Sequence, residues 1–307
     1  AGVVVAPEHR GRGVGGVLMD AMIERGRELG FVLSALYAAT VPVYRQRGYE
    51  VAGAQYRLSL DARLLRELRG GSVTLREATV DDAERIIDLT RDHYARARDN
   101  GPKADTLDDL RDELADPGIF AYVADRGFVQ YAWDGSDLAV YRLIADDPDT
   151  ARALWAVVGS GSSIAKTVYA YTSPDDPVVH LLGDGVVSDM RVSRWMHRCL
   201  DATAAIEGRG YPVATDIDVP IVLNDAQVPS NCVAGRLTVA GGKGQLILGP
   251  PANDAVRLGA NGLAALYAGT PTATLRAAGL LSGGADEAHA MLDAAFAGRP
   301  AYMHEYF

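Results

Sequence analysis

The chain has 307 residues, enough for two domains or three small ones, and 48% of them are hydrophobic while 23% are charged, as in ordinary globular proteins. Its net charge of −10 argues against a general nucleic-acid binder, which would carry a basic excess. No apolar run approaches the ~20 residues that a membrane span needs, and no secretory leader is visible. Two cysteines are too few for a disulfide framework or a zinc site, so we expect no metal, no membrane partner and a cytoplasmic location.

The acidic excess lies in the middle of the chain. Residues 1–69 hold 10 basic and 7 acidic side chains, whereas residues 73–180 hold 11 basic and 21 acidic ones. Such a region can steer a polycationic ligand toward the protein, although solubility alone also explains it. Charge by itself leaves both interpretations open.

The first 60 residues alternate between predicted strands and helices. The β-branched run Val3–Val5 predicts a buried strand end. From Val14 to Leu29 apolar residues recur at three- and four-residue steps, which predicts a helix with one buried face, ended by Gly30. We further expect a strand over 31–37, a helical turn over 41–50 and an alternating strand over 55–60.

The middle of the chain predicts a mixed α+β domain. Residues 63–71 are basic and end in a glycine pair, and we interpret them as a linker. A strand, a turn and a helix follow, with Thr79 as the expected N-cap. Next come predicted strands over 119–124, 127–133 and 138–145, a helix over 148–160, a strand over 166–173 and a loop-rich segment over 173–185.

The last third also alternates between strands and helices. Residues 187–211 predict a strand that gives way to a helix, and the apolar side of this helix carries Trp195, Cys199 and Leu200. Alternating strands are expected over 214–225, 232–242 and 244–250, then a helix–turn–helix over 259–284 and a final helix over 285–298.

The most specific motif is a glycine-rich turn before the first predicted helix. Its glycines are Gly11, Gly13, Gly15 and Gly16. Small residues let several N–H groups point into one concavity at the helix N-terminus, which suits a pyrophosphate, and Arg10 and Arg12 could pair with its oxygens. The spacing differs from the nicotinamide fingerprint, and a tight turn with a solvated basic rim is the plainer alternative.

Residues 3–30 resemble the acetyl-coenzyme A motif of the GCN5-related N-acetyltransferases, in which a strand precedes an Arg/Gln-x-x-Gly-x-Gly/Ala loop and a long helix. The segment "VYRQRGYE" resembles the closing motif of this family through Tyr44, Gly48 and Tyr49. The resemblance implies that the backbone of Val3, Val4 and Val5 pairs with the pantetheine arm. It also implies that Gly11–Gly16, Val14 included, hold the pyrophosphate and that Ala39 and Thr40 lie beside acetyl-CoA.

The layout of the whole chain resembles the enhanced-intracellular-survival family, which contains aminoglycoside N-acetyltransferases. The implied α+β architecture has two tandem GNAT-like domains, over 1–69 and 70–183, and a sterol-carrier-protein-like domain over 184–307. The second GNAT-like domain lacks the glycine-rich loop, and the chain is expected to begin at the fourth strand of the first. The family further implies a small cationic amine as acceptor, no metal, and a homo-oligomer, a ring-like hexamer.

Acetyl transfer needs a neutral amine, whereas an alkylammonium ion has a pKa of about 10. In the resembling family the tyrosine matched by Tyr44 is the acid, and the free C-terminal carboxylate, here that of Phe307, is the base. Burial would raise the pKa of that carboxylate, although chain ends more often fray in solvent. His304 and Glu305 are alternative bases, and we expect His9 to have a positioning role.

Two classes of function are consistent with these motifs. The first is an acetyl-CoA-dependent N-acetyltransferase that acts on aminoglycoside-like polycations, with protein lysines and polyamines as alternative acceptors. The second is a catalytically inactive protein whose sterol-carrier-like domain binds a lipid or another small molecule. The intact residues Arg10, Gly13, Gly15, Tyr44 and Phe307 favour the enzyme.

Overall fold

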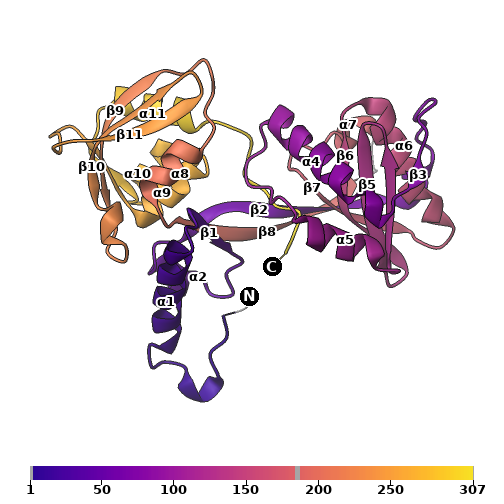
Figure 1. Ribbon diagram of the computed structural model, residues 1–307, viewed down its shortest axis with the longest axis horizontal. Helices are drawn as coiled ribbons and strands as arrows, with labels where there is room; N and C mark the ends of the chain where they lie inside the picture. Colours follow the sequence, from indigo (N-terminus) through magenta and orange to yellow (C-terminus); the bar gives the residue numbers. More distant parts are fainter. Residues whose placement is uncertain (1–2, 184–186, 307) are drawn as a thin grey trace. The chain divides into compact units, whose positions relative to one another are not determined.

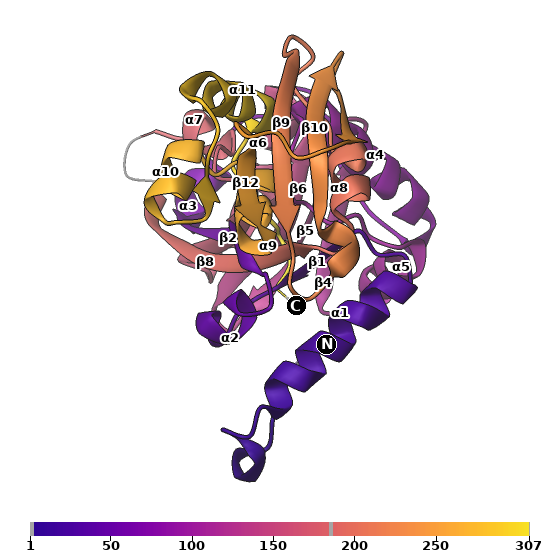
Figure 2. The ribbon, with the colours of Figure 1, turned by 90° about the vertical axis from the view of Figure 1, so that its left-hand side faces the viewer.

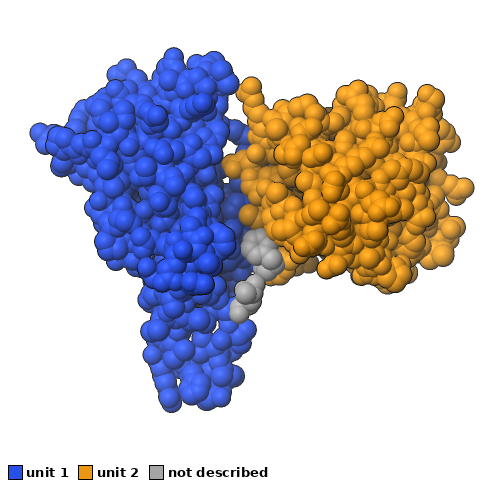
Figure 3. All heavy atoms as spheres, viewed as in Figure 1, with its two compact units in different colours: residues 1–53, 194–301, 307 blue, residues 54–193, 302–306 orange. Residues whose placement is uncertain are grey.

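A computed structural model describes residues 3–183 and 187–306 (Figure 1). The chain divides into two compact units, shown in different colours in Figure 3. Unit 1 comprises residues 1–53, 194–301 and 307, and unit 2 comprises residues 54–193 and 302–306. Strands β2 (Glu50–Asp61) and β8 (Val187–Cys199) each pass from one unit into the other. Compact units and sequence modules need not coincide, and the domain boundaries after residues 69 and 183 stay predictions.

The first part of unit 1 contains helix α1 (Val14–Glu28), strand β1 (Leu33–Leu36) and helix α2 (Val41–Arg45). Figure 2 shows α1 along its length. Strand β1 pairs antiparallel with the end of β8, so that Leu33 lies opposite Cys199. A small core joins these elements to later ones through Met19, Ile23, Tyr49, Met196, Leu200 and Val228.

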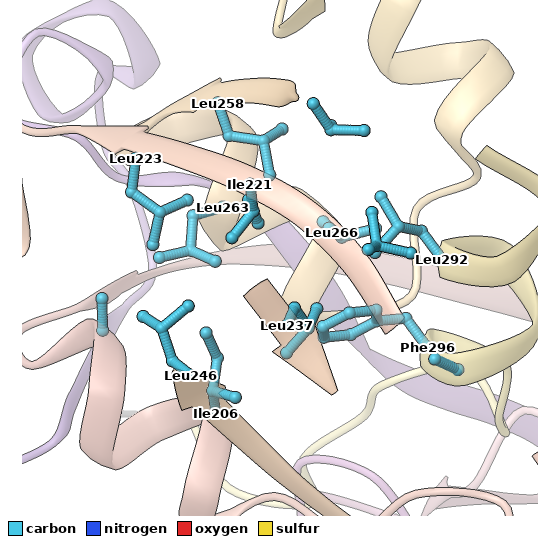
Figure 4. Close-up of a cluster of buried hydrophobic side chains, with 14 of the residues drawn as sticks. Ile206, Ile221, Leu223, Leu237, Leu246, Leu258, Leu263, Leu266, Leu292 and Phe296 are labelled. Carbon is cyan, nitrogen blue, oxygen red and sulfur yellow. The ribbon is translucent and has the colours of Figure 1, made fainter. Parts of the chain in front are cut away.

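The second part of unit 1 is a sheet covered by helices. Its described strands are β9 (Ile217–Asn224), β10 (Val233–Ala240), β11 (Lys243–Leu248), β12 (Val256–Gly259) and β13 (Leu281–Ser282), in the order β11-β10-β9-β12-β13. Its helices are α8 (Ala202–Gly208), α9 (Ala260–Tyr267), α10 (Thr272–Ala277) and α11 (Asp286–Phe296). Alternate side chains of β9 point into the apolar cluster between sheet and helices (Figure 4) because strand side chains alternate between faces.

Unit 2 is a sheet with helices on both faces. Its described strands are β3 (Arg76–Glu77), β4 (Ile119–Ala124), β5 (Gly127–Asp134), β6 (Asp137–Ala145) and β7 (Thr167–Thr172), and with β2 they run in the order β2-β7-β6-β5-β4-β3. Its helices are α3 (Ala62–Arg66), α4 (Ala83–Ala97), α5 (Leu107–Ala115), α6 (Pro148–Gly159) and α7 (Val178–Leu181).

The two faces of the unit 2 sheet have separate cores. Phe128 packs in the cluster that includes residues of α4 and α5, whereas its neighbour Val129 packs in the cluster that includes residues of α3 and α6. Strands β6 and β7 are parallel, joined through α6, while the other neighbouring strands are antiparallel. Short 3-10 turns in the two units cover Pro7–His9, Val80–Asp82, Ser160–Ser163 and Pro229–Asn231.

One prediction near the start of the chain is wrong, and another is confirmed only in part. Val3–Val5 is not a strand, because none of the described strands pairs with it. The helix after it is confirmed, but its buried side chains are Met19 and Ile23, whereas Val17 is 71% exposed. Periodicity identifies an apolar stripe, but the elements that pack on the helix decide which part is covered.

Three further predictions need correction. The expected linker begins with helix α3, because Asp61 caps it through Arg63 N (2.8 Å) and Leu65 enters the unit 2 core. Trp195 and Cys199 lie on β8 rather than on a helix; the helix that follows starts only after Asp201. The segment over 173–185 contains α7, and α5 and β12 were not predicted because both are short. The other predicted elements are present, including the Thr79 capping box before α4.

Candidate active site

A cavity of about 650 Å³ lies at the start of α1 in unit 1. The structure brings most of the predicted site residues together there, since Val3, Val4, Val5, Arg10, Gly11, Gly13, Val14, Gly15, Gly16, Ala39, Thr40 and Tyr44 all line it. His9 lines it as well. Its volume falls in the range of small-molecule sites, ~300–1,000 Å³.

The backbone of the glycine turn requires its glycines. Gly11 and Gly13 have φ of 74° and 78°, in the left-handed region that favours glycine. Gly13 precedes α1 without a side-chain cap, and the first helical bonds run from the N–H groups of Gly16 (2.9 Å) and Val17 (3.2 Å) to its carbonyl. The N–H groups at the start of α1 therefore remain available to an anion, and the helix dipole favours one.

Arg10 and Arg12 of the turn differ in their contacts, and a third arginine, Arg47, reaches the same cavity. Arg10 Nε donates to Val5 O (3.1 Å), which ties the extended segment to the turn. Arg12 is exposed and is not among the described residues that line the cavity. Arg47, which no sequence motif indicated, does line it and donates to Asp20 Oδ1 (3.1 Å). A Cβ at Gly16 would collide with the Arg47 guanidinium, so this glycine permits the approach.

Tyr44 enters the cavity from α2. Its ring packs edge-to-face on Tyr49, with centroids 6.2 Å apart and an interplanar angle of 73°. The Tyr49 hydroxyl in turn shares a hydrogen bond with Ser34 Oγ (2.8 Å), and burial raises the pKa of this hydroxyl. The buried Tyr49 is thus a fixed surface for the half-buried Tyr44, whose phenol faces the same cavity as the glycine turn.

A second cavity, of about 460 Å³, lies within unit 2 and was not predicted. Three carboxylates line it, from Glu113, Asp116 and Glu305. The buried Arg142 also lines it and forms ion pairs with Asp105 and with Glu305 (3.2 Å). Burial raises the pKa of Glu305, and the charge of Arg142 acts in the opposite direction.

The tail from Tyr302 to His304 is bound by unit 2 rather than frayed. Tyr302 N donates to Asn100 O (2.9 Å), and Gln55 Nε2 donates to His304 O (2.6 Å). Nδ1 of His304 lies 3.0 Å from Tyr171 O. Burial lowers the pKa of His304 to about 4, so the ring is neutral at pH 7 and its Nδ1–H donates to that carbonyl.

Several predictions concern other parts of the chain. Phe307, the predicted base, lies outside the described residues. Within residues 3–183 and 187–306, no group of three or more His, Cys, Asp or Glu side chains is placed to hold a metal. None of the helices in those residues combines the length and the apolar character needed to cross a bilayer. Cys199 is buried and Cys232 is exposed, and both are free thiols.

Known domain families match three parts of the chain. Profiles described as acetyltransferase (GNAT) domains match residues 1–52 and 93–199, and one described as a sterol carrier protein domain matches residues 202–304. They confirm the predicted tandem GNAT architecture with its C-terminal sterol-carrier-like part. The fold and the cavity at the glycine turn define a GCN5-related acetyltransferase.

Relatives make the assignment more specific. N-acetyltransferase Eis of Mycobacterium tuberculosis is 30% identical over 96% of this chain and 76% of its own length. The chain belongs to the Eis family of N-acetyltransferases, as the sequence resemblance predicts. A crystal structure of a GCN5-related N-acetyltransferase from Kribbella flavida, 46% identical, superposes with a TM-score of 0.98 over 100% of this chain and 78% of the other. Eis1 from Mycobacterium abscessus, at 24% identity and a TM-score of 0.74 over 99% of this chain and 80% of its own, shares the fold.

Proposed function

We propose that this enzyme transfers the acetyl group of acetyl-CoA to an amine of an aminoglycoside-like polycation. The observation that carries the proposal is the uncapped start of α1, where the glycine turn and Tyr44 share one cavity. GNAT acetyltransferases use acetyl-CoA, which supplies an acetyl group activated as a thioester. The N–H groups from Gly13 to Gly15 would hold its pyrophosphate, and Arg47 adds positive charge at the same cavity.

The remaining cofactor contacts follow the family pattern. The backbone of Val3–Val5 would bind the pantetheine arm. None of the described strands pairs with these residues, so no neighbouring strand uses their N–H and C=O groups. Ala39 and Thr40 are exposed at the cavity, beside the same arm. Arg10 would mainly stabilise the turn, through its hydrogen bond to the Val5 carbonyl, and would contribute less to binding the phosphate.

The catalytic roles are those of an acid and a base. The Phe307 carboxylate would accept a proton from the ammonium group of the acceptor, and the resulting neutral amine would attack the thioester carbonyl. The Tyr44 hydroxyl would donate a proton to the departing thiolate. His304 is a weaker candidate base, because its Nδ1 is bound to Tyr171 O and burial lowers its pKa to about 4. Glu305 is the stronger alternative, since burial raises its pKa, which makes a carboxylate more basic.

A polycationic acceptor fits the charges of unit 2. Its cavity presents the carboxylates of Glu113, Asp116 and Glu305. Of these three, Glu305 forms an ion pair with Arg142. Cationic groups gain from such a site both by steering and by direct ion pairing. Protein lysines and polyamines are alternative acceptors with the same charge, and an aminoglycoside differs from them by its rigid ring system.

The decisive assay measures release of coenzyme A thiol from acetyl-CoA with an aminoglycoside, a linear polyamine or a lysine peptide as acceptor. We expect the highest kcat/KM for the aminoglycoside. A preference for the peptide or polyamine by more than tenfold would overturn the acceptor class, and absence of turnover with all three would overturn the proposed transfer to cationic amines.

The base is tested at the chain end. Adding two glycines after Phe307 moves the carboxylate while keeping the aromatic side chain, and we expect kcat to fall by ~10²-fold or more with acetyl-CoA affinity unchanged. The matched control, Phe307→Leu, keeps the carboxylate in register and should lose much less activity. Full activity of the extended chain would exclude the terminal carboxylate and leave Glu305 as the base to test, by Glu305→Gln.

We also propose a cytoplasmic homo-oligomer, by analogy with the ring-like hexamer of the family. The exposed free thiol of Cys232 is compatible with a reducing compartment. Light scattering after size-exclusion chromatography should give six times the chain mass; a monomer or dimer at micromolar concentration would contradict the hexamer.

A further inference from the structure

The carbonyl groups after Tyr44 are bound by side chains from distant parts of the sequence. Helix α2 has five residues, too few to be stable alone, and the last carbonyls of a helix lack helical donors. Three side chains donate to carbonyls at the end of this helix or in the turn directly after it. Asn261 Nδ2 donates to Arg45 O (2.9 Å) and to Tyr49 O (2.8 Å), Gln227 Nε2 donates to Gln46 O (3.2 Å) and Arg198 Nη1 donates to Arg47 O. We call Arg198, Gln227 and Asn261 the donor cluster.

Arg198 is held rigidly in unit 1. Its side chain is fully buried on β8, and its Nη2 contacts both carboxylate oxygens of Asp225 at 2.6 Å. Asp225 also accepts from the N–H of Val228 (3.0 Å) and from Asn231 Nδ2 (3.1 Å). The guanidinium approaches the chain where Gly48 has a φ of 76°, and a Cβ there would collide with it. The glycine of the closing motif therefore admits this donor.

Asn261 lies in the first turn of α9 and bridges the two ends of the turn over residues 45–49, which follows Tyr44. Arg45 directly follows Tyr44, and Tyr49 is the residue whose ring packs against Tyr44. One amide group thus fixes both the helix that carries the phenol and the aromatic surface beside it. Satisfying one of these carbonyls would be a sufficient role for any single donor. The convergence of three donors on the turn over residues 45–49, directly after this helix, points to a role in orienting it.

We propose that Asn261, supported by Gln227 and Arg198, is a positioning residue for the Tyr44 hydroxyl, so that the sterol-carrier-like part of the chain orients the acid. The inference rests on the proposed function, in which Tyr44 donates the proton. It assigns this C-terminal part a direct place in acetyl transfer through the hydrogen bonds of α9 to the Tyr44 turn.

The test is a double-mutant cycle in the full-length enzyme. Asn261→Asp keeps the size of the side chain but replaces the donor with a carboxylate that faces two carbonyl oxygens. We expect kcat to fall about tenfold, while the KM for acetyl-CoA stays within about twofold of the wild-type value. On a Tyr44→Phe background the same change should slow turnover by less than about twofold, because two residues that act through one group are not additive. Asn253→Asp, at an exposed position before β12, is the matched control and should leave kcat unchanged.

The outcomes separate the two proposals. If Tyr44→Phe retains full turnover, the acid assignment in the proposed function is wrong. If Tyr44→Phe is slow but Asn261→Asp lowers kcat by the same factor on both backgrounds, Tyr44 stands and the positioning role of Asn261 is wrong. Asn261→Gln, which keeps an amide donor, should recover part of the lost kcat.

A second variant covers the case in which Asn261→Asp fails to fold. Gln227 is exposed, so Gln227→Leu removes the donor to Gln46 O without opening a core. We expect kcat to fall by about threefold, and by nothing measurable on the Tyr44→Phe background. An equal loss on both backgrounds would overturn the inference.

Discussion

The two GNAT-like parts of the chain start their central helices in opposite ways. Helix α1 follows Gly13, which provides no side-chain cap. Helix α6, between the parallel strands β6 and β7, follows Asp147, whose carboxylate accepts from the N–H groups of Asp149 (3.0 Å) and Thr150 (2.8 Å) and from the Thr150 hydroxyl (2.8 Å). These hydrogen bonds, led by that from Thr150 N, lower the pKa of Asp147.

This contrast explains why one helix start is suited to a diphosphate and the other is not. An N-terminus binds an external anion through N–H groups that have no internal partner. In α6 the chain supplies its own anion, which stabilises the helix and would repel a phosphate. In α1 that position is open, as the proposed pyrophosphate site requires, whereas in α6 the same position serves local stability.

Installing an acid at the open helix start should have the largest effect. In Gly15→Asp the new Cβ would lie 3.6 Å from Val5 Cγ2, an ordinary contact, and an acid in the first helical turn does not weaken a helix. We expect acetyl-CoA to bind ~10- to 100-fold more weakly by calorimetry at low salt, because the carboxylate repels the pyrophosphate and occupies its donors.

Gly15→Asn is the control for size in this experiment, and it should lose no more than about threefold in affinity. Equal weakening by Asp and Asn would indicate a steric effect instead of a charge effect. Binding of wild-type strength by the Asp variant would show that the pyrophosphate lies elsewhere.

The buried tail of unit 2 should make that unit sensitive to acid. His304 stays neutral down to a pKa of about 4 in the folded protein, whereas an unfolded histidine takes up a proton near pH ~6.5. Between these values the unfolded state binds more protons, so the free energy of unfolding falls as the pH drops, by up to ~1.4 kcal/mol per pH unit for this group.

Amide exchange of β7, which includes Tyr171, would report this loss within unit 2. His304→Gln keeps a side-chain donor but cannot titrate, so we expect the pH dependence between 6.5 and 4 to become shallower. An unchanged slope would mean that His304 is not the group that takes up the proton.

The smallest effect should come from removing the Asp147 carboxylate that caps α6. Asp147→Ala should destabilise α6 by about 1 kcal/mol at neutral pH, the usual loss for a helix cap, measured by amide exchange in Pro148–Gly159. Because the folded-state pKa of Asp147 is lowered, the difference from wild type should shrink as the pH falls below ~4 and the carboxylate takes up its proton. A difference that stays constant down to acidic pH would assign the effect to packing.

Local sequence signals predicted local structure well. The glycine turn is recognised from backbone conformations, and the Tyr44 motif from a spacing, that each involve only a few neighbouring residues. The structure brings the turn and Tyr44 to one cavity. The Thr79 capping box is of the same kind. Such features are readable because their physical cause and their residues are adjacent in the chain.

Features that depend on distant contacts were missed. Arg47 reaches the cavity only because Gly16 leaves space for its guanidinium. The cavity of unit 2 combines Gln55, Glu113 and Glu305, and no pattern links residues so far apart. Likewise the apolar residues of α1 predicted a helix correctly but not its covered side, which Met19 and Ile23 occupy.

The donor cluster also has a consequence for how the protein is made. At ~5–20 residues per second a ribosome releases the Tyr44 segment well before it has polymerised Asn261. The turn after Tyr44 therefore lacks its Asn261 donor until more than 200 further residues have been made, as the 216-residue separation from Arg45 to Asn261 requires. Residues 54–193 of unit 2 are encoded in between and have the time to fold first, whereas the contacts of Asn261 with this turn and the 302–306 tail of unit 2 form only afterwards.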